Sequence, residues 1–321
     1  MGALNKVMTA EEAVSRFIHD GDDVAIGGFS TNRKPYAIIR EVIRQGKKDL
    51  VLETSSGGGT DDMLIGCGLV KAINVGYIAN AGYSMVCRRF RKATEGGTLP
   101  FEDYSIDVQT IAYHGAALGL PYVPIKNMLG SDLEAKWGIS EEQRKAIPKL
   151  PPKKFVIQDD PFQPGNKLCL VPTPKIDVAI IHVQTASPSG ICRIMGTPFQ
   201  DEDIAIAAKH TIVSCEELVS EEEIRRNPEL NTLPGLVVDA VVHAPWGAHP
   251  SQVFGYYDYD PQALIQYENV SKTDEDFAAY IRKYVMDAKT DEEYLDLIGK
   301  DHLETLKVDP ELGFARDLPR K

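Results

Sequence analysis

The sequence predicts an α/β protein: an open, doubly wound, mostly parallel sheet flanked by helices, with a helical C-terminal tail. Short apolar runs alternate with amphipathic helical stretches three times in the first third of the chain. Each apolar run leads into a glycine-rich turn and then a helix. Parallel strands need such crossovers, because consecutive strands must start at the same edge of the sheet. The 321 residues, 43% of them apolar, are enough to bury a large core.

The first unit begins at Thr9, which opens a capping box followed by an apolar helical stripe. That helix ends near Gly21, and the buried strand 24–26 follows. Pro35 suits the first position of a second helix, because its missing N–H is not needed there. Gly46 is the expected end of that helix.

The second and third units repeat this order. The strand 50–52 is expected to end at Glu53, where the glycine-rich turn 53–60 begins. A helix over 61–66 and a strand over 72–79 follow. The third turn, 80–84, leads into a basic helix.

The remaining elements extend the same architecture. We expect a helix at 107–118, strands at 122–125, 168–171, 178–183, 211–215 and 237–242, and helices at 273–288 and 291–306. Residues 1–260 are therefore predicted to form a single α/β domain, with a Pro/Lys-rich surface insertion near 140–167. Residues 261–321 are predicted to be a helical extension packed on that domain or on a partner.

Composition excludes several classes of protein. The net charge of −12 disfavours nucleic-acid binding, which needs a basic surface. No apolar run reaches the roughly 20 residues that span a bilayer, and the N-terminus lacks the pattern of a signal peptide, so we expect a cytoplasmic protein. The five scattered cysteines are expected to be reduced, and their spacing does not suggest a metal site.

Common nucleotide and hydrolase motifs are missing. Gly27 and Gly28 are adjacent and no third glycine follows, so the dinucleotide pattern Gly-x-Gly-x-x-Gly is not met. The chain also has no Walker lysine sequence and no Gly-x-Ser-x-Gly elbow. A nicotinamide or ATP site is therefore not expected.

The stretch from Asp20 to Pro35 resembles the signature of the family I CoA-transferases, first-subunit type, except that Arg33 stands where that pattern usually has glycine. The turn 244–251 (Ala-Pro-Trp-Gly-Ala-His-Pro-Ser) resembles a late motif of the glutaconate-type first subunits. The resemblance runs in one order from about Val7 to Asp309. Further matching segments are Arg33–Ala37, Asp62–Gly66, Arg88–Lys92, Ala116–Pro121, Val178–His182, Phe199–Asp201 and Glu223–Arg226.

The resemblance implies a function. Such a chain is the first of the two subunits of a heteromeric CoA-transferase that moves CoA between an acyl-CoA and a short-chain acid, dicarboxylic and glutaconate-like. The nucleophilic glutamate belongs to the second subunit, where it forms a glutamyl-CoA thioester. CoA thioesters are substrates, and neither a metal nor a permanently bound cofactor is implied. The alternative is a thioester hydrolase, carbon–carbon hydrolase or decarboxylase on the same fold.

Substrate-binding residues are expected in the three glycine turns. Their backbone N–H groups are candidate donors to the tetrahedral oxyanion. The turn residues that we select are Gly27, Gly28, Phe29, Ser30, Ser56, Gly57, Ala81 and Gly82. Ala81 stands where the glutaconate-type sequences are expected to have serine, which leaves the acyl substrate open.

Four further features have two interpretations each. Arg33 and Lys34 suit a carboxylate of the substrate, or else form a surface pair or a salt bridge to Asp22 or Asp23. His249 donates to a ligand or is structural. The basic run Arg88–Lys92 is a solvated face or partner surface, or else contacts a CoA phosphate.

Glu53 is the one candidate nucleophile in this chain. The resemblance places the catalytic glutamate after a strand in the second subunit. On one interpretation, Glu53 is the corresponding strand-end residue of this chain. It is equally an ordinary strand-end carboxylate, or a group that contacts substrate or partner.

Overall fold

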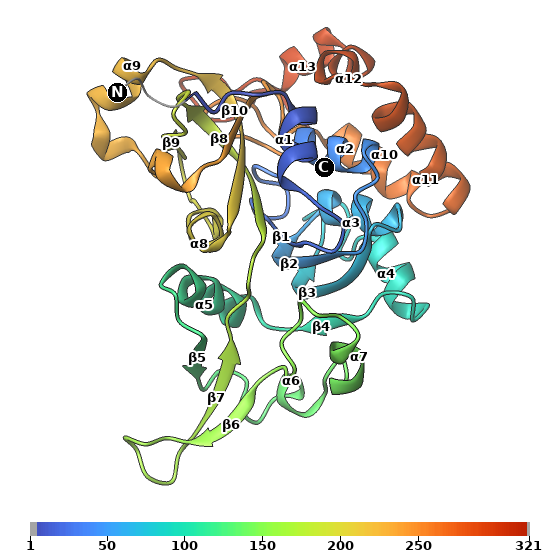
Figure 1. Cartoon of the computed structure of the whole chain (residues 1–321). Coiled ribbons are helices and arrows are strands. Elements are labelled where there is room, and N and C mark those ends of the chain that lie inside the picture. The colour runs from blue at the N-terminus through green and yellow to red at the C-terminus, as the bar shows by residue number, and fades with distance from the viewer. Residues whose placement is uncertain (1–4, 320–321) are drawn as a thin grey trace.

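A computed structural model gives the structure of the protein and describes residues 5–319 (Figure 1). Within that range the central sheet contains seven parallel strands in the order β11-β10-β8-β1-β2-β3-β4, and the short β9 (Cys192–Arg193) pairs antiparallel with β8. The prediction of a mostly parallel, doubly wound sheet is confirmed. The parallel strands are β1 (Asp23–Ile26), β2 (Leu50–Gly57), β3 (Val70–Ile78), β4 (Phe101–Asp103), β8 (Val178–Ala186), β10 (His210–Leu218) and β11 (Ala240–His243).

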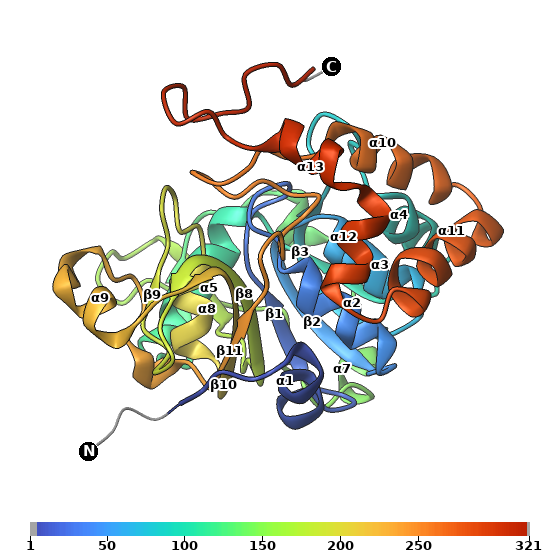
Figure 2. The ribbon, with the colours of Figure 1, turned by 90° about the horizontal axis from the view of Figure 1, so that it is seen from above.

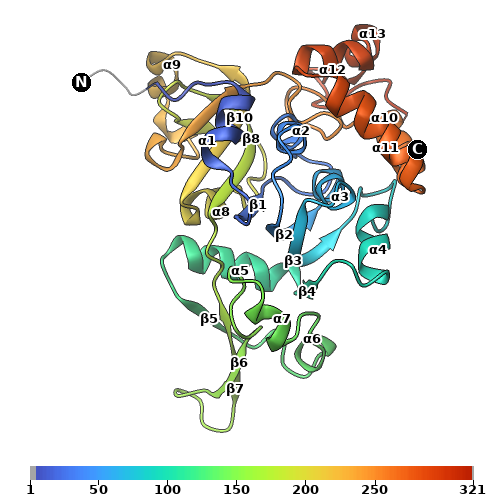
Figure 3. The same cartoon turned by 45° about the vertical axis from the view of Figure 1, so that its right-hand side comes forward.

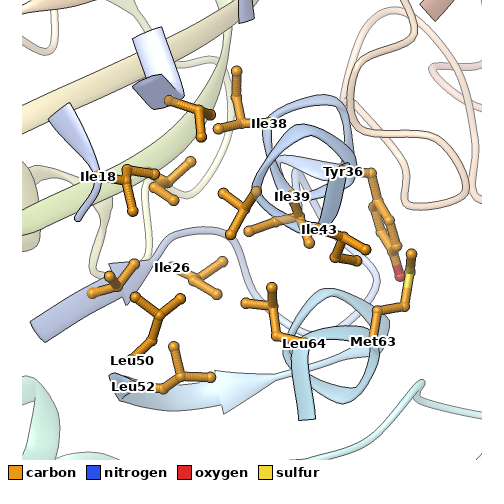
Figure 4. Packing of buried hydrophobic residues seen from close by; sticks show 14 of the residues in the cluster. Ile18, Ile26, Tyr36, Ile38, Ile39, Ile43, Leu50, Leu52, Met63 and Leu64 are labelled. Atoms are coloured by element: carbon orange, nitrogen blue, oxygen red, sulfur yellow. The ribbon is translucent and has the colours of Figure 1, made fainter. Parts of the chain in front are cut away.

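Helices cover both faces of this sheet. On one face lie α1 (Ala10–Phe17), α2 (Tyr36–Arg44) and α3 (Gly59–Gly66); on the other lie α5 (Ile106–Ala117) and α8 (Asp201–Ala207). Side chains of β1 alternate between the two cores, because successive strand residues point to opposite faces. Val24 and Ile26 pack under α2 and α3, whereas Ala25 packs on the α5 side. Figure 4 shows the first of these cores.

A second, antiparallel sheet of order β5-β7-β6 packs against the far side of α5. Its strands are β5 (Tyr122–Ile125), β6 (Val156–Asp159) and β7 (Lys167–Pro172). The hairpin of β6 and β7 projects away from the body of the molecule (Figures 1 and 3).

The segment predicted as a surface insertion contains α7 (Glu141–Lys145) and β6. A buried charge cluster attaches it to the main sheet: Glu102 of β4 pairs with Arg144 of α7 and, at 3.0 Å, with the Lys154 ammonium. All three side chains are fully buried. Loss of one partner would leave an uncompensated buried charge, so this cluster fixes where the segment lies.

The C-terminal residues form helices that lie over α2, α3 and α4 (Arg88–Glu95), as Figure 2 shows. The Arg40 guanidinium of α2 pairs with Asp291 at 2.7 Å and lies 3.8 Å from the ring centroid of Tyr294. The division of the chain at residue 260 stays a prediction. The helices are α10 (Pro261–Val270), α11 (Asp274–Ile281), a π-helical segment (Arg282–Asp287), α12 (Asp291–Ile298) and α13 (Lys300–Leu306).

Several element bounds differ from those predicted. β2 continues through the polar residues to Gly57 instead of ending before Glu53, and β11 begins at Ala240, after a 3-10 turn over Gly235–Val237. The short α6 (Asp132–Ala135) and α9 (Glu221–Arg226) were not predicted. All five cysteines are free thiols, and four are buried. Among the described residues, no helix is long and apolar enough to cross a membrane.

Candidate functional site

The three glycine turns meet at the carboxyl ends of β1, β2 and β3. The Ser30 hydroxyl donates to the Ala79 carbonyl at 2.8 Å and accepts from the Ala81 N–H at 3.2 Å. The Ser30 N–H donates to the Ser56 carbonyl at 3.3 Å. The structure therefore brings the predicted turn residues together around Ser30. This edge of a parallel sheet is where α/β proteins place ligands.

Close packing explains two of the glycines. A Cβ on Gly28 would collide with the Asn32 carbonyl oxygen, and its φ of 75° lies in the left-handed region. A Cβ on Gly58 would collide with the Ser30 carbonyl oxygen. Gly28 therefore lets the first turn close on itself, and Gly58 lets the second turn approach the first.

Most backbone donors of these turns are already used within the chain, which corrects the expectation that they serve an oxyanion. The Gly28 N–H donates to Asp201, and the Gly58 and Gly59 N–H groups donate to Asp61 and Asn80. The N–H groups of Gly27, Phe29, Ser30, Ala81 and Tyr83 likewise have acceptors in the chain. An N–H that stabilises a turn in this way is not free for substrate.

Arg33 lies beneath the first turn, not in the solvent. Its guanidinium pairs with Asp201 at 2.5 Å and donates to the carbonyls of His182 and Thr197 at 3.1 and 2.9 Å. The expected salt bridge to Asp22 or Asp23 is therefore replaced by one to Asp201. The φ of Arg33 is 47°, which explains why the family pattern has glycine at this position.

Lys34 is fully buried and lies 3.5 Å from Asp61, and neither Asp22 nor Asp23 is its partner. The Asp61 carboxylate also accepts from the hydroxyl groups of Thr54 and Thr60. The two cations predicted to bind a substrate carboxylate are thus each paired with an internal aspartate. Those aspartates, Asp61 and Asp201, are components of the edge that the sequence analysis did not select.

His249 is also internal. Its Nδ1 lies 2.7 Å from the Tyr294 hydroxyl, and its Nε2 lies 3.0 Å from the Asp260 carboxylate. Burial lowers the pKa of His249, which favours a neutral ring. Both ring nitrogens are occupied within the chain, so the geometry supports the structural interpretation rather than the ligand-binding one.

Glu53 does not lie at a strand end. It is a buried mid-strand residue of β2, opposite Ala25 of β1 and Asn74 of β3. The Asn74 amide donates to its carboxyl oxygen at 2.5 Å, and burial raises the pKa of Glu53 to about 7. Its side chain lines a 30 Å³ cavity beside α5, four residues before the glycine turn. This position is set back from the edge where the turns meet.

An aromatic cluster borders the turns. The Phe29 ring stacks on Phe199 with centroids 4.9 Å apart and meets the edge of Tyr77 at 6.0 Å. All three rings are half-buried, and Ala81 and Gly82 beside them are exposed. Tyr77 and Phe199 were not selected from the sequence. Tyr77 belongs to a predicted strand, so only the pairing of β3 with β2 places it here.

The basic helix faces the C-terminal helices. Arg89 pairs with Asp274 and lies 4.6 Å from the Phe277 ring centroid, and Arg88 pairs with Glu268 at 2.5 Å. Lys92 also contacts Asp274, at 2.6 Å. Three of its basic side chains therefore have acidic partners in the C-terminal part of the same chain.

Comparison with known proteins identifies the family. A family model described as coenzyme A transferase matches residues 7–244, about three-quarters of the chain. The chain belongs to the coenzyme A transferase family. It is 53% identical over 318 residues to the first (A) subunit of the glutaconate CoA-transferase of Acidaminococcus fermentans, with 99% of each chain covered. It is 34% identical to the first (A) subunit of the 3-oxoadipate CoA-transferase of Pseudomonas knackmussii, over 90% of this chain and 96% of that protein.

The same family relation holds in three dimensions. The crystal structure of the Acidaminococcus fermentans glutaconate coenzyme A-transferase matches this chain with a TM-score of 0.96 at 54% identity, covering 97% of this chain and 98% of the other. In this coenzyme A transferase, the turns, the buried Arg33–Asp201 pair and the aromatic cluster form one continuous edge.

Proposed function

We propose that this chain is the first subunit of a heteromeric CoA-transferase that moves CoA between an acyl-CoA and a short-chain dicarboxylic acid of the glutaconate type. The substrate class rests on the 53% identity to the corresponding chain of a glutaconate CoA-transferase, over nearly the whole of both chains. CoA thioesters enter as substrates, and a second subunit completes the site.

The placement of the carboxylates carries the proposal that the nucleophile belongs to the second subunit. At the carboxyl edge, Asp61 and Asp201 are fully buried, and each is held by one backbone N–H group and a cation. A carboxylate held in this way cannot attack a thioester. Glu53 is buried in the sheet and set back from the edge. The chain thus offers walls for a pocket, but its own acids are poorly placed for the chemistry.

The reaction then divides between two chains. In the second subunit, a glutamate attacks the acyl-CoA thioester, which releases CoA thiolate and leaves a mixed anhydride. The thiolate attacks the glutamyl carbonyl, which frees the donor acid and forms a glutamyl-CoA thioester. The acceptor acid repeats these steps in reverse. This chain supplies a rigid, partly aromatic wall that excludes water from the anhydride.

We also propose that the second subunit covers the carboxyl edge. Exposed and half-buried apolar side chains lie around the turns, and a contiguous apolar surface marks an interaction site. Met85 is 88% exposed, and the Gln184 amide donates to both the Met195 and Phe254 carbonyls, which places those two residues side by side. We call this set the edge patch: Phe29, Tyr77, Met85, Met195, Phe199 and Phe254.

The test is to express the chain with its second subunit, then to treat the complex with acyl-CoA, reduce it with borohydride and map the modified peptide by mass spectrometry. Borohydride reduces a glutamyl thioester to an alcohol, so the nucleophile is marked by a loss of mass. We expect the marked peptide in the second subunit, and unchanged marking in a complex that carries Glu53→Gln.

Two results would contradict the proposal. Marking of the Glu53 peptide would assign the chemistry to this chain. Consumption of thioester without marking of either chain, and without transfer to an added acid, would favour a hydrolase or decarboxylase on the same fold.

A further inference from the structure

A pocket of 760 Å³ lies at the amino edge of the main sheet, at the opposite end of the strands from the glycine turns. Asp23 begins β1, Ile176 and Lys209 precede β8 and β10, and all three residues line the pocket. Proline rings are apolar and fix the backbone φ, so a wall that is rich in proline is rigid and suits an uncharged part of a ligand. The prolines of this wall are Pro121, Pro148, Pro151, Pro152, Pro172 and Pro174.

The small cavity beside α5 adjoins this pocket. Its volume is 30 Å³, and Glu53, Pro151 and Thr173 line both spaces. Glu53 therefore lies between the small cavity and the larger pocket. A space of 30 Å³ holds about two water molecules, or one ammonium group.

Three buried acceptor atoms around these two spaces have no hydrogen-bond partner among residues 5–319: Asp23 Oδ1, Asn74 Oδ1 and Gln109 Oε1. The three side chains are 1%, 6% and 3% exposed. Asn74 and Gln109 line the small cavity, and Asp23 lines the pocket. Because buried polar groups are normally hydrogen-bonded, these acceptors favour a ligand that brings donors.

Asp23 and Glu53 also differ from the neighbouring buried acids, because neither forms an ion pair within the described part of the chain. Glu102, opposite Asn74 in the next strand, has two cationic partners, and so does Asp177. Burial raises the pKa of both Asp23 and Glu53. A primary ammonium would supply a cation here, and it has three N–H donors and no acceptor.

The mouth of the pocket is basic. Lys149, Lys175 and Lys209 line it, and all three side chains reach solvent. One carboxylate, that of Asp177, accepts from both Lys149 and Lys209, at 2.5 and 2.6 Å. The excess of positive charge repels a plain amine and attracts a ligand that has an anionic group at its far end.

We propose that this pocket binds a small linear ω-amino acid. Its ammonium group contacts Glu53, Asn74 and Gln109, its alkyl stem lies along the prolines, and its carboxylate is held by the lysines of the mouth. The pocket is separate from the carboxyl edge, so the inference does not depend on the proposed CoA-transferase reaction. Such a ligand contacts β2, β3 and α5 together, and it stabilises the folded chain by mass action.

The experiment is titration calorimetry of the full chain in complex with its second subunit, at pH 8, where Glu53 is largely ionised. The probes are β-alanine, γ-aminobutyrate and ε-aminocaproate, with glycine and the matching alkylamines and alkyl carboxylates as controls. We expect at least one of the three ω-amino acids to bind saturably, with one ligand per copy of this chain. Glycine, whose two charges are too close together, and the singly charged controls should bind at least tenfold more weakly.

Three variants locate the ligand. Glu53→Gln removes the charge at nearly constant size and should weaken binding of the ω-amino acid at least tenfold. Lys175→Ala should weaken it at least threefold and leave binding of the matching alkylamine unchanged; because Lys175 is exposed, this variant tests the site even if Glu53→Gln misfolds. Lys71→Ala is the control, because Lys71 is an exposed lysine near the start of β3 that does not line the pocket.

The proposal is overturned if none of the three ω-amino acids binds, if folded Glu53→Gln binds like the wild type, or if the alkylamine binds as tightly as the amino acid. It is also overturned if Lys71→Ala weakens binding as much as Lys175→Ala does. Displacement of the ligand by a saturating acyl-CoA or acid substrate would likewise overturn it, because the ligand would then occupy the carboxyl edge.

Discussion

Arg33 and Asp201 form a buried ion pair beneath the first glycine turn, and each charge depends on the other. Removing one partner of such a pair leaves an uncompensated buried charge, at a cost of about 3–5 kcal/mol. We therefore expect Arg33→Met to lower the free energy of unfolding by about that amount, as measured by urea denaturation. Arg33→Met combined with Asp201→Asn should recover much of the loss, because no charge is then left buried.

The single variant Arg33→Met also separates two roles of Arg33. If Arg33 only supports the turn, its substitution changes the free energy of unfolding and the amount of folded protein. If Arg33→Met had the stability of the wild type and instead raised KM for the acid substrate, Arg33 would be a ligand contact and the internal pair would not be its function.

Glu53 makes stability depend on pH. Its pKa is about 7 in the folded state and near 4.5 when unfolded. Between these values the folded state holds a proton that the unfolded state has released, so stability falls as pH rises through this window. Between pH 5.5 and pH 8 we expect the ionisation of Glu53 to lower the free energy of unfolding by about 2 kcal/mol.

Glu53→Gln should remove this part of the pH dependence. Glutamine keeps an oxygen for the Asn74 amide but does not ionise. Urea denaturation measures the free energy of unfolding of both proteins at pH 5.5 and pH 8. The value for the variant, relative to that of the wild type, should be higher at pH 8 than at pH 5.5. An equal difference at both pH values would mean that Glu53 is ionised throughout.

The residues at the carboxyl edge show which parts of the candidate site can be predicted from the sequence and which cannot. The turns were predicted because glycines after apolar runs indicate strand-to-helix junctions, and Ser30 does join them. The partners of Arg33 and Lys34 were not predicted, because Asp201 is 168 residues from Arg33 and only the order of the strands brings it there. Asp201 lies within the resemblance segment Phe199–Asp201, so that segment was a signal for its importance but not for its role.

At the scale of elements, α4 is attached to the C-terminal helices chiefly by Arg89. Its side chain is almost fully buried, contacts Asp274 and lies over the Phe277 ring. Arg89→Ala removes both the charge and the packing of the side-chain stem. We expect hydrogen exchange in α11 to become at least tenfold faster in this variant.

Arg91 on the same helix is the matched control. It is exposed, and among residues 5–319 its ion-pair partner is Glu95 one turn away; such surface pairs are worth about 0.2–1 kcal/mol. Arg91→Ala should leave exchange in α11 unchanged. Equal exchange in the two variants would mean that the α4 charges do not hold the C-terminal helices in place.

Element bounds were predicted well where apolar periodicity defines them and poorly where tertiary partners do. The strand 122–125 has the predicted bounds, and the predicted helix 107–118 is displaced by one residue. β2 is longer than predicted because Glu53 and Thr54 are polar, yet Asn74 and Asp61 satisfy them inside the sheet. The basic helix was assigned to solvent, a partner or a phosphate because its acidic partners are about 180 residues away.

At the scale of the whole molecule, the edge patch has a physical consequence for assembly. Six apolar or aromatic side chains lie around turns whose backbone N–H groups mostly have acceptors within the chain. Apolar surface is unfavourable in water, so the free energy of the molecule falls when a partner buries it. The fold class followed from the alternation of strands and helices, but the edge patch did not, because its members come from separate loops and strands.

We expect Phe254→Lys and Met85→Lys each to weaken the association with the second subunit by at least tenfold in Kd. A lysine retains a long side chain but brings a charge that must be desolvated in a dry contact, and interface residues of this kind carry roughly 1–2 kcal/mol or more. Leu118→Lys is the control, because Leu118 is similarly exposed at the end of α5. Titration calorimetry of the two purified subunits measures all three variants. Tight binding by both edge variants, or equal weakening by the control, would place the second subunit on another face and would leave the edge patch without its proposed partner.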